Sequence, residues 1–309
     1  SKDTVAPEHP DIKLSQAIAM LLADQSADAE KQLRLIVKNQ PAHLSAWSLL
    51  AEILMNRGAF AEIRETVIPA MRVATGRAGH TRTLIEMTQG CLFMRETPPN
   101  ADEARACFTH ALEQDPKLPA ASEELLRADL LLGNASYLEA DALRILSHIP
   151  DHAAANAILG SRRLAQKRYV EAESFLRKSI GRQATCGALN DLAELLRQQG
   201  KRAEAEQQAR LAIRLKPDFY QAWDTLGNIL LEGGRLDEAN GPLRCALALG
   251  SNDPRLYLTL TRLRIKQGRF QDASQALAYS KPLLSHASSS ILEEHKQLKQ
   301  QLCTQSKSN

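Results

Sequence analysis

One spacing, thirty-four positions, recurs along the second half of the chain and strongly limits what the chain can fold into. Two ladders of small residues follow this spacing: Gly200, Gly234, Gly268 and Ala205, Ala239, Ala273. Aromatic residues follow it as well, since Trp223 and Tyr257 are separated by the same interval. A fixed period of about 20 to 50 residues is typical of arrays in which each repeat is one supersecondary unit. The sequence therefore predicts a stack of similar units.

The clearest unit, Tyr220 to Asp253, divides into two helical patterns. The first half places apolar or small residues at helical spacing: Trp223, Leu226, Gly227 and Leu230. Gly233 and Gly234 interrupt this pattern and can adopt the positive φ that ends a helix. A second helical pattern starts at Leu236. Each unit is therefore predicted to be two short antiparallel helices joined by a tight turn.

Small residues on both helices indicate how the two helices pack. Gly227 on the first helix and Ala239 on the second are expected to face each other, so that the backbones approach closely. Trp223 and two leucines would then cover the hydrophobic stripe. Because one hairpin cannot bury that stripe alone, neighbouring units must stack.

The pattern of Trp223, Leu226-Gly227, Leu230, Gly234, Ala239 and Ala246 resembles the tetratricopeptide repeat. The resemblance covers about residues 10–285. Eight copies are expected, and they begin near Pro10, Leu44, Thr83, Pro119, Ala153, Cys186, Tyr220 and Pro254. The second copy places Ile63 where a small residue is usual, and the third has a slightly longer turn at 95–100. The fourth blurs the pattern, with Arg127 and Asp129 next to the core.

The resemblance implies an all-α fold, an α-solenoid in which antiparallel helix pairs form a right-handed superhelix. The expected organisation is an N-terminal extension (1–9), the solenoid (10–285), and a C-terminal capping helix and tail (286–309). In that tail, Ile291, Leu298 and Leu302 share one face of a helix expected over 290–302. This face would cover the open apolar end of the solenoid.

Motifs that carry chemistry are missing from the sequence. It contains no Walker loop, no Gly-x-Gly-x-x-Gly and no His-Glu-x-x-His. His148 and His152 have the spacing of one helical turn, but Pro150 between them removes the helical meaning of that spacing. The five cysteines form no Cys-x-x-Cys and are interpreted as buried free thiols. No catalytic residue, metal ligand or cofactor is expected, and the chain is interpreted as a non-catalytic protein.

Function is then expected on the surface that the stack creates. The resemblance implies a concave groove, lined by the first helix of each repeat, that binds extended peptides or a partner's helix. Matching helix positions gives nine groove candidates: Asn190, Glu194, Arg197, Gln221, Asp224, Asn228, Arg255, Arg262 and Lys266. An Asn side chain can hydrogen-bond a peptide backbone in either direction, and Arg can bind a carboxylate with two bonds.

A second periodic feature is basic. Arg168, Arg202, Arg235 and Arg269 recur at the repeat period to within one position, inside the turns between paired helices. One hypothesis is a basic edge that attracts an acidic partner or an anionic surface. The competing interpretation is that these are ordinary polar turn residues.

Composition favours another protein or peptide as the binding partner. The net charge is only +3 and aromatic residues make up 4% of the chain, so nucleic acid is not expected. No stretch approaches the roughly 18 apolar residues of a membrane span, so direct membrane insertion is not expected. The charge is uneven, −5 over residues 1–150 and +8 over 151–309.

Two alternative functions stay open. One is a regulatory or substrate-docking module of a multi-component enzyme, or of a secretion or assembly system. The other is a self-associating structural protein whose acidic half stacks on its basic half. A cytoplasmic location is expected, with removal of a signal peptide before Ser1 as the alternative.

Overall fold

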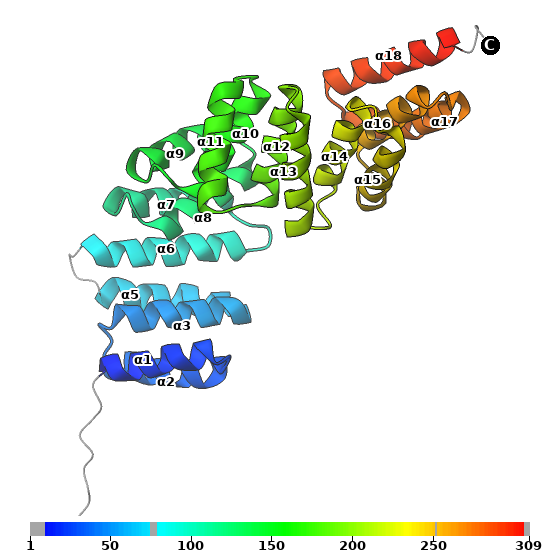
Figure 1. Cartoon of the computed structure of the whole chain (residues 1–309). Coiled ribbons are helices and arrows are strands. Elements are labelled where there is room, and N and C mark those ends of the chain that lie inside the picture. Colours follow the sequence, from blue (N-terminus) through cyan, green and yellow to red (C-terminus); the bar gives the residue numbers. More distant parts are fainter. Residues whose placement is uncertain (1–9, 75–78, 251, 306–309) are drawn as a thin grey trace, which may run out of the picture. The chain divides into compact units, whose positions relative to one another are not determined.

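The computed structural model describes residues 10–74, 79–250 and 252–305, and within these ranges it is built from helices without any strand (Figure 1). The chain divides into two compact units, Ser1–Pro150 and Asp151–Asn309. In each unit, helices that follow each other in the chain pack against each other. The predicted all-α, α-solenoid fold class is therefore confirmed.

The first unit contains three complete helix pairs and an irregular one. Its helices are α1 (Pro10–Leu22), α2 (Ser26–Asn39), α3 (Leu44–Arg57), α4 (Phe60–Glu62), α5 (Ile68–Ala74), α6 (Gly79–Arg95), α7 (Ala101–Gln114), α8 (Pro119–Leu132) and α9 (Ala135–His148). A π-helical stretch, Ile63–Val67, joins α4 to α5. These two short helices and the stretch between them form the second helix of the second repeat.

The second unit is more regular. Its helices are α10 (Ala153–Ala165), α11 (Tyr169–Arg182), α12 (Cys186–Gln198), α13 (Arg202–Leu215), α14 (Tyr220–Glu232), α15 (Leu236–Leu249), α16 (Pro254–Lys266), α17 (Phe270–Ser280) and α18 (Ser289–Gln305). A short 3-10 helix, Lys281–His286, connects α17 to α18. The even-numbered helices α10 to α16 are the first helices of four repeats, and each packs against the odd-numbered helix that follows it.

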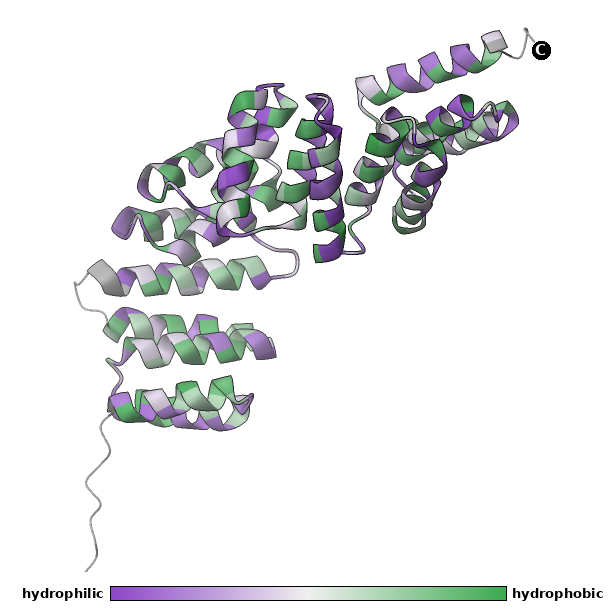
Figure 2. Cartoon of the chain, viewed as in Figure 1, coloured by the Kyte–Doolittle hydropathy of each residue, from purple (hydrophilic) through white to green (hydrophobic). Residues whose placement is uncertain are grey.

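The helices begin where the repeat period predicts. The first helix of every repeat starts at the predicted residue, except that α6 starts at Gly79 instead of Thr83. The longer turn of the third repeat is confirmed between Arg95 and Ala101. Figure 2 shows hydrophobic and hydrophilic residues alternating along the helices, as expected of helices that bury one stripe each.

Left-handed backbone ends the first helix of the regular repeats. Gly200, Gly234 and Gly268 have φ between 72 and 77°. Glycine adopts this conformation without steric cost, which explains the glycine ladder of the sequence. In the fifth repeat the same conformation falls on Lys167, whose φ is 60°.

A leucine of the second helix packs closely against the glycine of the first. A Cβ added at Gly227 would lie 2.5 Å from Leu243 Cδ2. Gly160 packs against Leu176 in the same way. Ala239 is fully buried one helical turn before Leu243. The glycine therefore makes room for a leucine of the second helix, because a side chain at either glycine would collide with it.

The two tryptophans mark equivalent positions but are buried to different extents. In both cases Nε1–H donates a hydrogen bond of 2.9 Å to a prolyl carbonyl, Pro41 for Trp47 and Pro217 for Trp223. Trp47 is 9% exposed and belongs to the core of the first unit. Trp223, expected to cover the hydrophobic stripe, is only half-buried. The core of its repeat is built instead by Leu226, Leu230 and Leu243.

The second and fourth repeats show how the structure differs where the sequence departs from the repeat pattern. Ile63, at the position of a small residue, is fully buried and begins the π-helical stretch. The wider π turn gives a large side chain room that the regular helix reserves for alanine. In the fourth repeat Asp129 is fully buried, as its place in the pattern predicts, whereas Arg127 is exposed.

The C-terminal helix α18 caps the second unit. It packs on α16 and α17 (Figure 1), with Leu298 and Leu302 buried in one cluster with Leu258, Ala273 and Leu277. Ile291 packs against the same cluster. The apolar face predicted for the tail is therefore confirmed, and the helix is slightly longer at both ends than expected.

Candidate functional site

The nine predicted groove residues lie on α12, α14 and α16, the first helices of three consecutive repeats of the second unit. We call them the first-helix face. Arg255 and Lys266 are exposed and the other seven are half-buried. The face is therefore polar and accessible, and some of its side chains also bind groups of the neighbouring repeat.

Arg197 links the first two of these repeats. Its Nε donates a hydrogen bond of 2.8 Å to Glu194 Oε2 on the same helix, and its Nη1 donates to Glu232 at the end of α14. The hydrogen bond with Glu194 is the main reason that the pKa of Arg197 is raised. The guanidinium is thus held between two carboxylates.

Arg262 links the next two repeats and reaches the capping helix. Its Nη2 donates to Asn228 Oδ1 of α14 at 2.7 Å and to Thr259 Oγ1 at 3.1 Å. Its Nε lies 3.3 Å from Glu294 Oε1 of α18. Lys266 adds a second link, since its Nζ donates to the carbonyl of Leu231 at 3.4 Å. Polar contacts therefore run without a break from α14 to α18.

Asp224 is the most perturbed acid of the first-helix face. Burial raises its pKa to about 6, although Arg255 and Arg262 act in the opposite direction. It accepts a hydrogen bond of 3.1 Å from Asn228 Nδ2. Arg255 is itself bound to Asp253, with Nη2 2.6 Å from Oδ2. Near pH 6 the Asp224 carboxyl therefore exists in both charge states.

Asn190 and Gln221 each have a hydrogen-bonding atom that no described residue binds. The Asn190 Oδ1 atom is buried and accepts no hydrogen bond from the described residues. The Gln221 side chain makes no hydrogen bond or ion pair within the described part of the chain. Asn190 stands beside Asp191, whose pKa is raised by burial and held down by hydrogen bonds from Ser161 and Asn190.

The predicted site residues did not include Asn156, a buried polar residue of α10. Asn156 is the fourth residue of its helix, whereas Asn190 and Asp224 are the fifth residues of α12 and α14. Asn156 is fully buried, and its Nδ2 donates to the carbonyl of His152 at 2.9 Å. The repeat register could not have located it, because the position of Asn190 and Asp224 is taken by Ala157 in α10.

The acidic partners of the arginines were also missed. Glu232, Asp253 and Glu294 each bind or contact an arginine of the first-helix face. Glu232 follows Arg197 by one position more than the repeat period, which is a detectable signal. No signal in the sequence pointed to Glu294, because only the packing of α18 on α16 brings it to Arg262.

Three of the four basic-edge arginines are paired locally. Arg168, Arg235 and Arg269 each precede the second helix of a repeat, and each binds an acid in the first turn of that helix: Glu171 at 2.7 Å, Glu238 at 2.5 Å and Asp272 at 2.5 Å. Arg235 also lies 2.7 Å from Glu206. Arg202 forms no ion pair within the residues that the structure describes. The edge therefore has mixed charge, with Arg202 as its unneutralised member.

Nucleophiles and metal ligands are not gathered into a cluster. Burial raises the pKa of Cys91 to about 11 and that of Cys107 to about 12, so both are protonated thiols at neutral pH. Cys303 is exposed, contrary to the expectation of buried thiols, and the five cysteines form no disulfide. Among the described residues, no three His, Cys, Asp or Glu side chains stand together as a metal site would need.

None of the helices in the described part of the chain combines the length and the apolar character needed to cross a bilayer.

Comparison with known proteins supports the repeat assignment. Residues 190–254 match the family model of the tetratricopeptide repeat. No curated protein matches the chain.

Several solved structures share the fold. The APC/C hetero-tetramer Cut9–Hcn1 superposes with a TM-score of 0.58 at 16% identity, over 93% of this chain and 55% of that chain. PilF of Pseudomonas aeruginosa gives 0.55 at 17% identity, over 72% of this chain and 99% of its own length. PilW, a type IV pilus biogenesis factor, superposes with a TM-score of 0.53 at 19% identity, over 68% of this chain and 97% of that chain. The chain thus spans about half the length of the first of these. At such identities the likeness is one of fold.

Proposed function

We propose that this tetratricopeptide-repeat chain is a protein-interaction scaffold that binds an extended segment of a partner protein along the first-helix face. The repeat fold is typical of interaction scaffolds, and the first-helix face supplies donors, acceptors and both signs of charge. The segment crosses α12, α14 and α16 and uses the groups that the internal network leaves available.

The observation that carries the proposal is the amide of Asn190. A buried acceptor without a hydrogen bond costs roughly 1–3 kcal/mol, so it is rarely kept without a use. Asn190 shares its position in the repeat with Asp224, so α12 and α14 each present one polar group there. A backbone N–H of a bound peptide would satisfy Asn190 Oδ1 once the half-buried side chain turns that atom toward the segment.

The charges of the first-helix face indicate how the bound partner segment is oriented. Arg255 and Lys266 of α16 are exposed, whereas Glu194 of α12 is half-buried beside Arg197. An acidic side chain of the segment is therefore expected over α16, and its backbone over α12.

Selection from a random library of 12-residue peptides on the full chain tests the proposal. Enriched peptides are synthesised and their Kd is measured by fluorescence anisotropy. Asn190→Ala and Arg255→Ala are each expected to weaken binding about tenfold, the equivalent of one good hydrogen bond or charge contact. Gln207→Ala, an exposed change on α13, is the control and should leave Kd unchanged.

Two results would contradict the proposal. One is enrichment of no peptide above the level seen with an unrelated helical protein. The other is a set of peptides whose affinity is the same for the wild type, Asn190→Ala and Arg255→Ala.

A further inference from the structure

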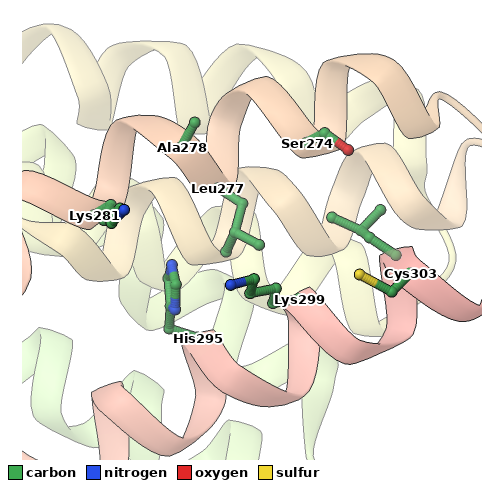
Figure 3. Close-up of a pocket in the computed structure, with 8 residues that line it drawn as sticks. Ser274, Leu277, Ala278, Lys281, His295, Lys299 and Cys303 are labelled. Carbon is green, nitrogen blue, oxygen red and sulfur yellow. The ribbon is translucent and has the colours of Figure 1, made fainter.

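A cavity of about 380 Å³ opens between α17 and α18, away from the first-helix face. Its floor includes Leu277 and Leu302, which are 6% and 8% exposed. Its rim carries Lys281, His295 and Lys299. Figure 3 shows Leu277 pointing from α17 toward α18, and His295 and Lys299 projecting from α18 toward α17. We call this cavity the end slot.

The repeat register identifies what the end slot corresponds to. Helix α18 begins one position later than a full repeat period after α16, and it packs on α16 and α17 as α16 packs on α14 and α15. It therefore occupies the place of the first helix of a ninth repeat. In the preceding repeats each first helix packs against a second helix, and the end slot offers a surface of α17 and α18 for such a helix.

Buried positions in the preceding repeat support this register. Leu256 and Leu263 of α16 are buried, and the residues 35 positions further along the chain, Ile291 and Leu298, pack in the cluster that contains Leu277. His295 and Lys299 of α18 line the slot. The part of α18 that lines the slot is therefore basic instead of apolar.

Charge decides what kind of helix the slot accepts. The ionisable residues lining it are Lys281, His295, Lys299 and the thiol of Cys303, and no carboxylate lines it. The neighbouring acid Glu294 is engaged with Arg262 instead. A basic helix in this slot would be repelled, whereas carboxylates on either side of an apolar stripe would meet the two lysines.

We propose that the end slot binds an amphipathic helix of a partner protein, with small apolar residues inward and Asp or Glu side chains against Lys281 and Lys299. The apolar stripe of this helix needs residues no larger than those of α17, where Ala273, Ala276 and Leu277 form the buried face. This surface is separate from the first-helix face, so the scaffold has two places at which it can hold a partner.

Two synthetic 14-residue helices test the proposal on the full chain. Both carry Ala and Leu on one face. The first has Glu at the flanking positions and the second has Lys, and each is labelled with fluorescein for anisotropy. The wild type should bind the Glu helix at least tenfold more tightly than the Lys helix. The double change Lys281→Glu and Lys299→Glu, which alters two exposed residues, should reverse this preference.

A steric variant provides an independent measurement. Ala278→Trp places a large side chain at an exposed position that lines the slot and should abolish binding of the Glu helix. Ala248→Trp, at an exposed position of α15 outside the slot, is the matched control and should bind as the wild type does. Circular dichroism of each variant verifies that the helices are intact.

Three results would overturn the proposal. Equal affinity for the two helices would remove the electrostatic selection, and undiminished binding to Ala278→Trp would place the helix elsewhere. Concentration-dependent dimerisation in light scattering that Ala278→Trp abolishes would assign the slot to a second copy of this chain.

Discussion

The two units are built from the same repeat, yet they treat charged residues differently. In the second unit, the arginines and acids of α12, α14 and α16 lie on a half-exposed face and link neighbouring repeats. In the first unit, Arg105 of α7 binds Asp129 of α8 and Asp141 of α9, and both acids are buried. The polar contacts of the regular repeats therefore lie on an accessible face, whereas the acids that bind Arg105 are buried among the helices of the first unit.

The buried cluster of the first unit illustrates the difference. Arg105 Nε donates to Asp129 Oδ1 at 2.8 Å, and its guanidinium lies 4.3 Å from the ring centre of Tyr137. Asp129 Oδ2 is buried and accepts no hydrogen bond from the described residues. One arginine thus faces two carboxylates, and burial together with Asp141 raises the pKa of Asp129 to about 6.

The largest effect is expected from the two tryptophans, which make the same hydrogen bond in different surroundings. Trp47→Ala should lower the free energy of unfolding of the first unit by about 3–5 kcal/mol, as for other large core truncations. Trp223→Ala should cost about half as much in the second unit, because its side chain is only half-buried. Hydrogen exchange of amides in each unit measures the two values separately.

The matching Trp→Phe changes are the control. Each removes the hydrogen bond to the prolyl carbonyl and should cost about 1 kcal/mol in either unit. Equal costs for the two alanine variants would show that the difference in burial has no energetic consequence.

The next largest effect is the pH dependence of stability that Asp129 causes in the first unit. Its pKa is about 6 in the folded protein against 3.8 for an ordinary Asp, so the folded state binds a proton more readily than the unfolded state. Its contribution to stability is therefore complete below about pH 4 and is lost as the pH rises through 6. The shift corresponds to at most about 3 kcal/mol.

Urea unfolding of the first unit at several pH values checks this expectation. The chain has two tryptophans, so in a Trp223→Phe background the fluorescence of Trp47 reports the first unit alone. Asp129→Asn should remove the loss of stability between about pH 4 and pH 6.5, and Asp218→Asn, in an exposed loop of the second unit, should not. Identical pH profiles for the two variants would refute the role given to Asp129.

A smaller effect on stability is expected from replacing glycines of the second unit by alanine, with opposite signs at a closely packed and an open position. Gly227→Ala should destabilise the unit by about 1–3 kcal/mol, because its Cβ would lie 2.5 Å from Leu243 Cδ2. Gly181→Ala, on α11 with nothing within 4 Å, should stabilise it by about 0.5–1 kcal/mol through helix propensity. Thermal melts of the two variants should move in opposite directions, and a shift of the same sign would contradict this packing.

The smallest effect is expected at Lys167, which adopts the left-handed backbone that glycine adopts in the following repeats. Lys167→Gly should stabilise the fifth repeat by about 0.5–1 kcal/mol, since it removes the steric cost of that conformation. Gly200→Ala should have the opposite sign and a similar size, because Gly200 has a φ of 77°. Chemical denaturation of the second unit compares the two, and destabilisation by Lys167→Gly would be the contrary outcome.

Local patterns in the sequence were enough to predict the helices and their register. The periodic ladders of Gly and Ala predict where each first helix begins, because backbone conformation at a turn and apolar periodicity along a helix are local properties. The same period relates Asn190 and Asp224, so part of the first-helix face was also readable in advance.

Which side chains meet was settled by the packing of the helices in three dimensions. That packing placed Leu243 against Gly227, brought Glu294 to Arg262 and left the end slot open beside α18. Each of these depends on how far one helix is shifted and rotated against another. Such geometry is set by contacts among several side chains at once, and no spacing along the chain encodes it.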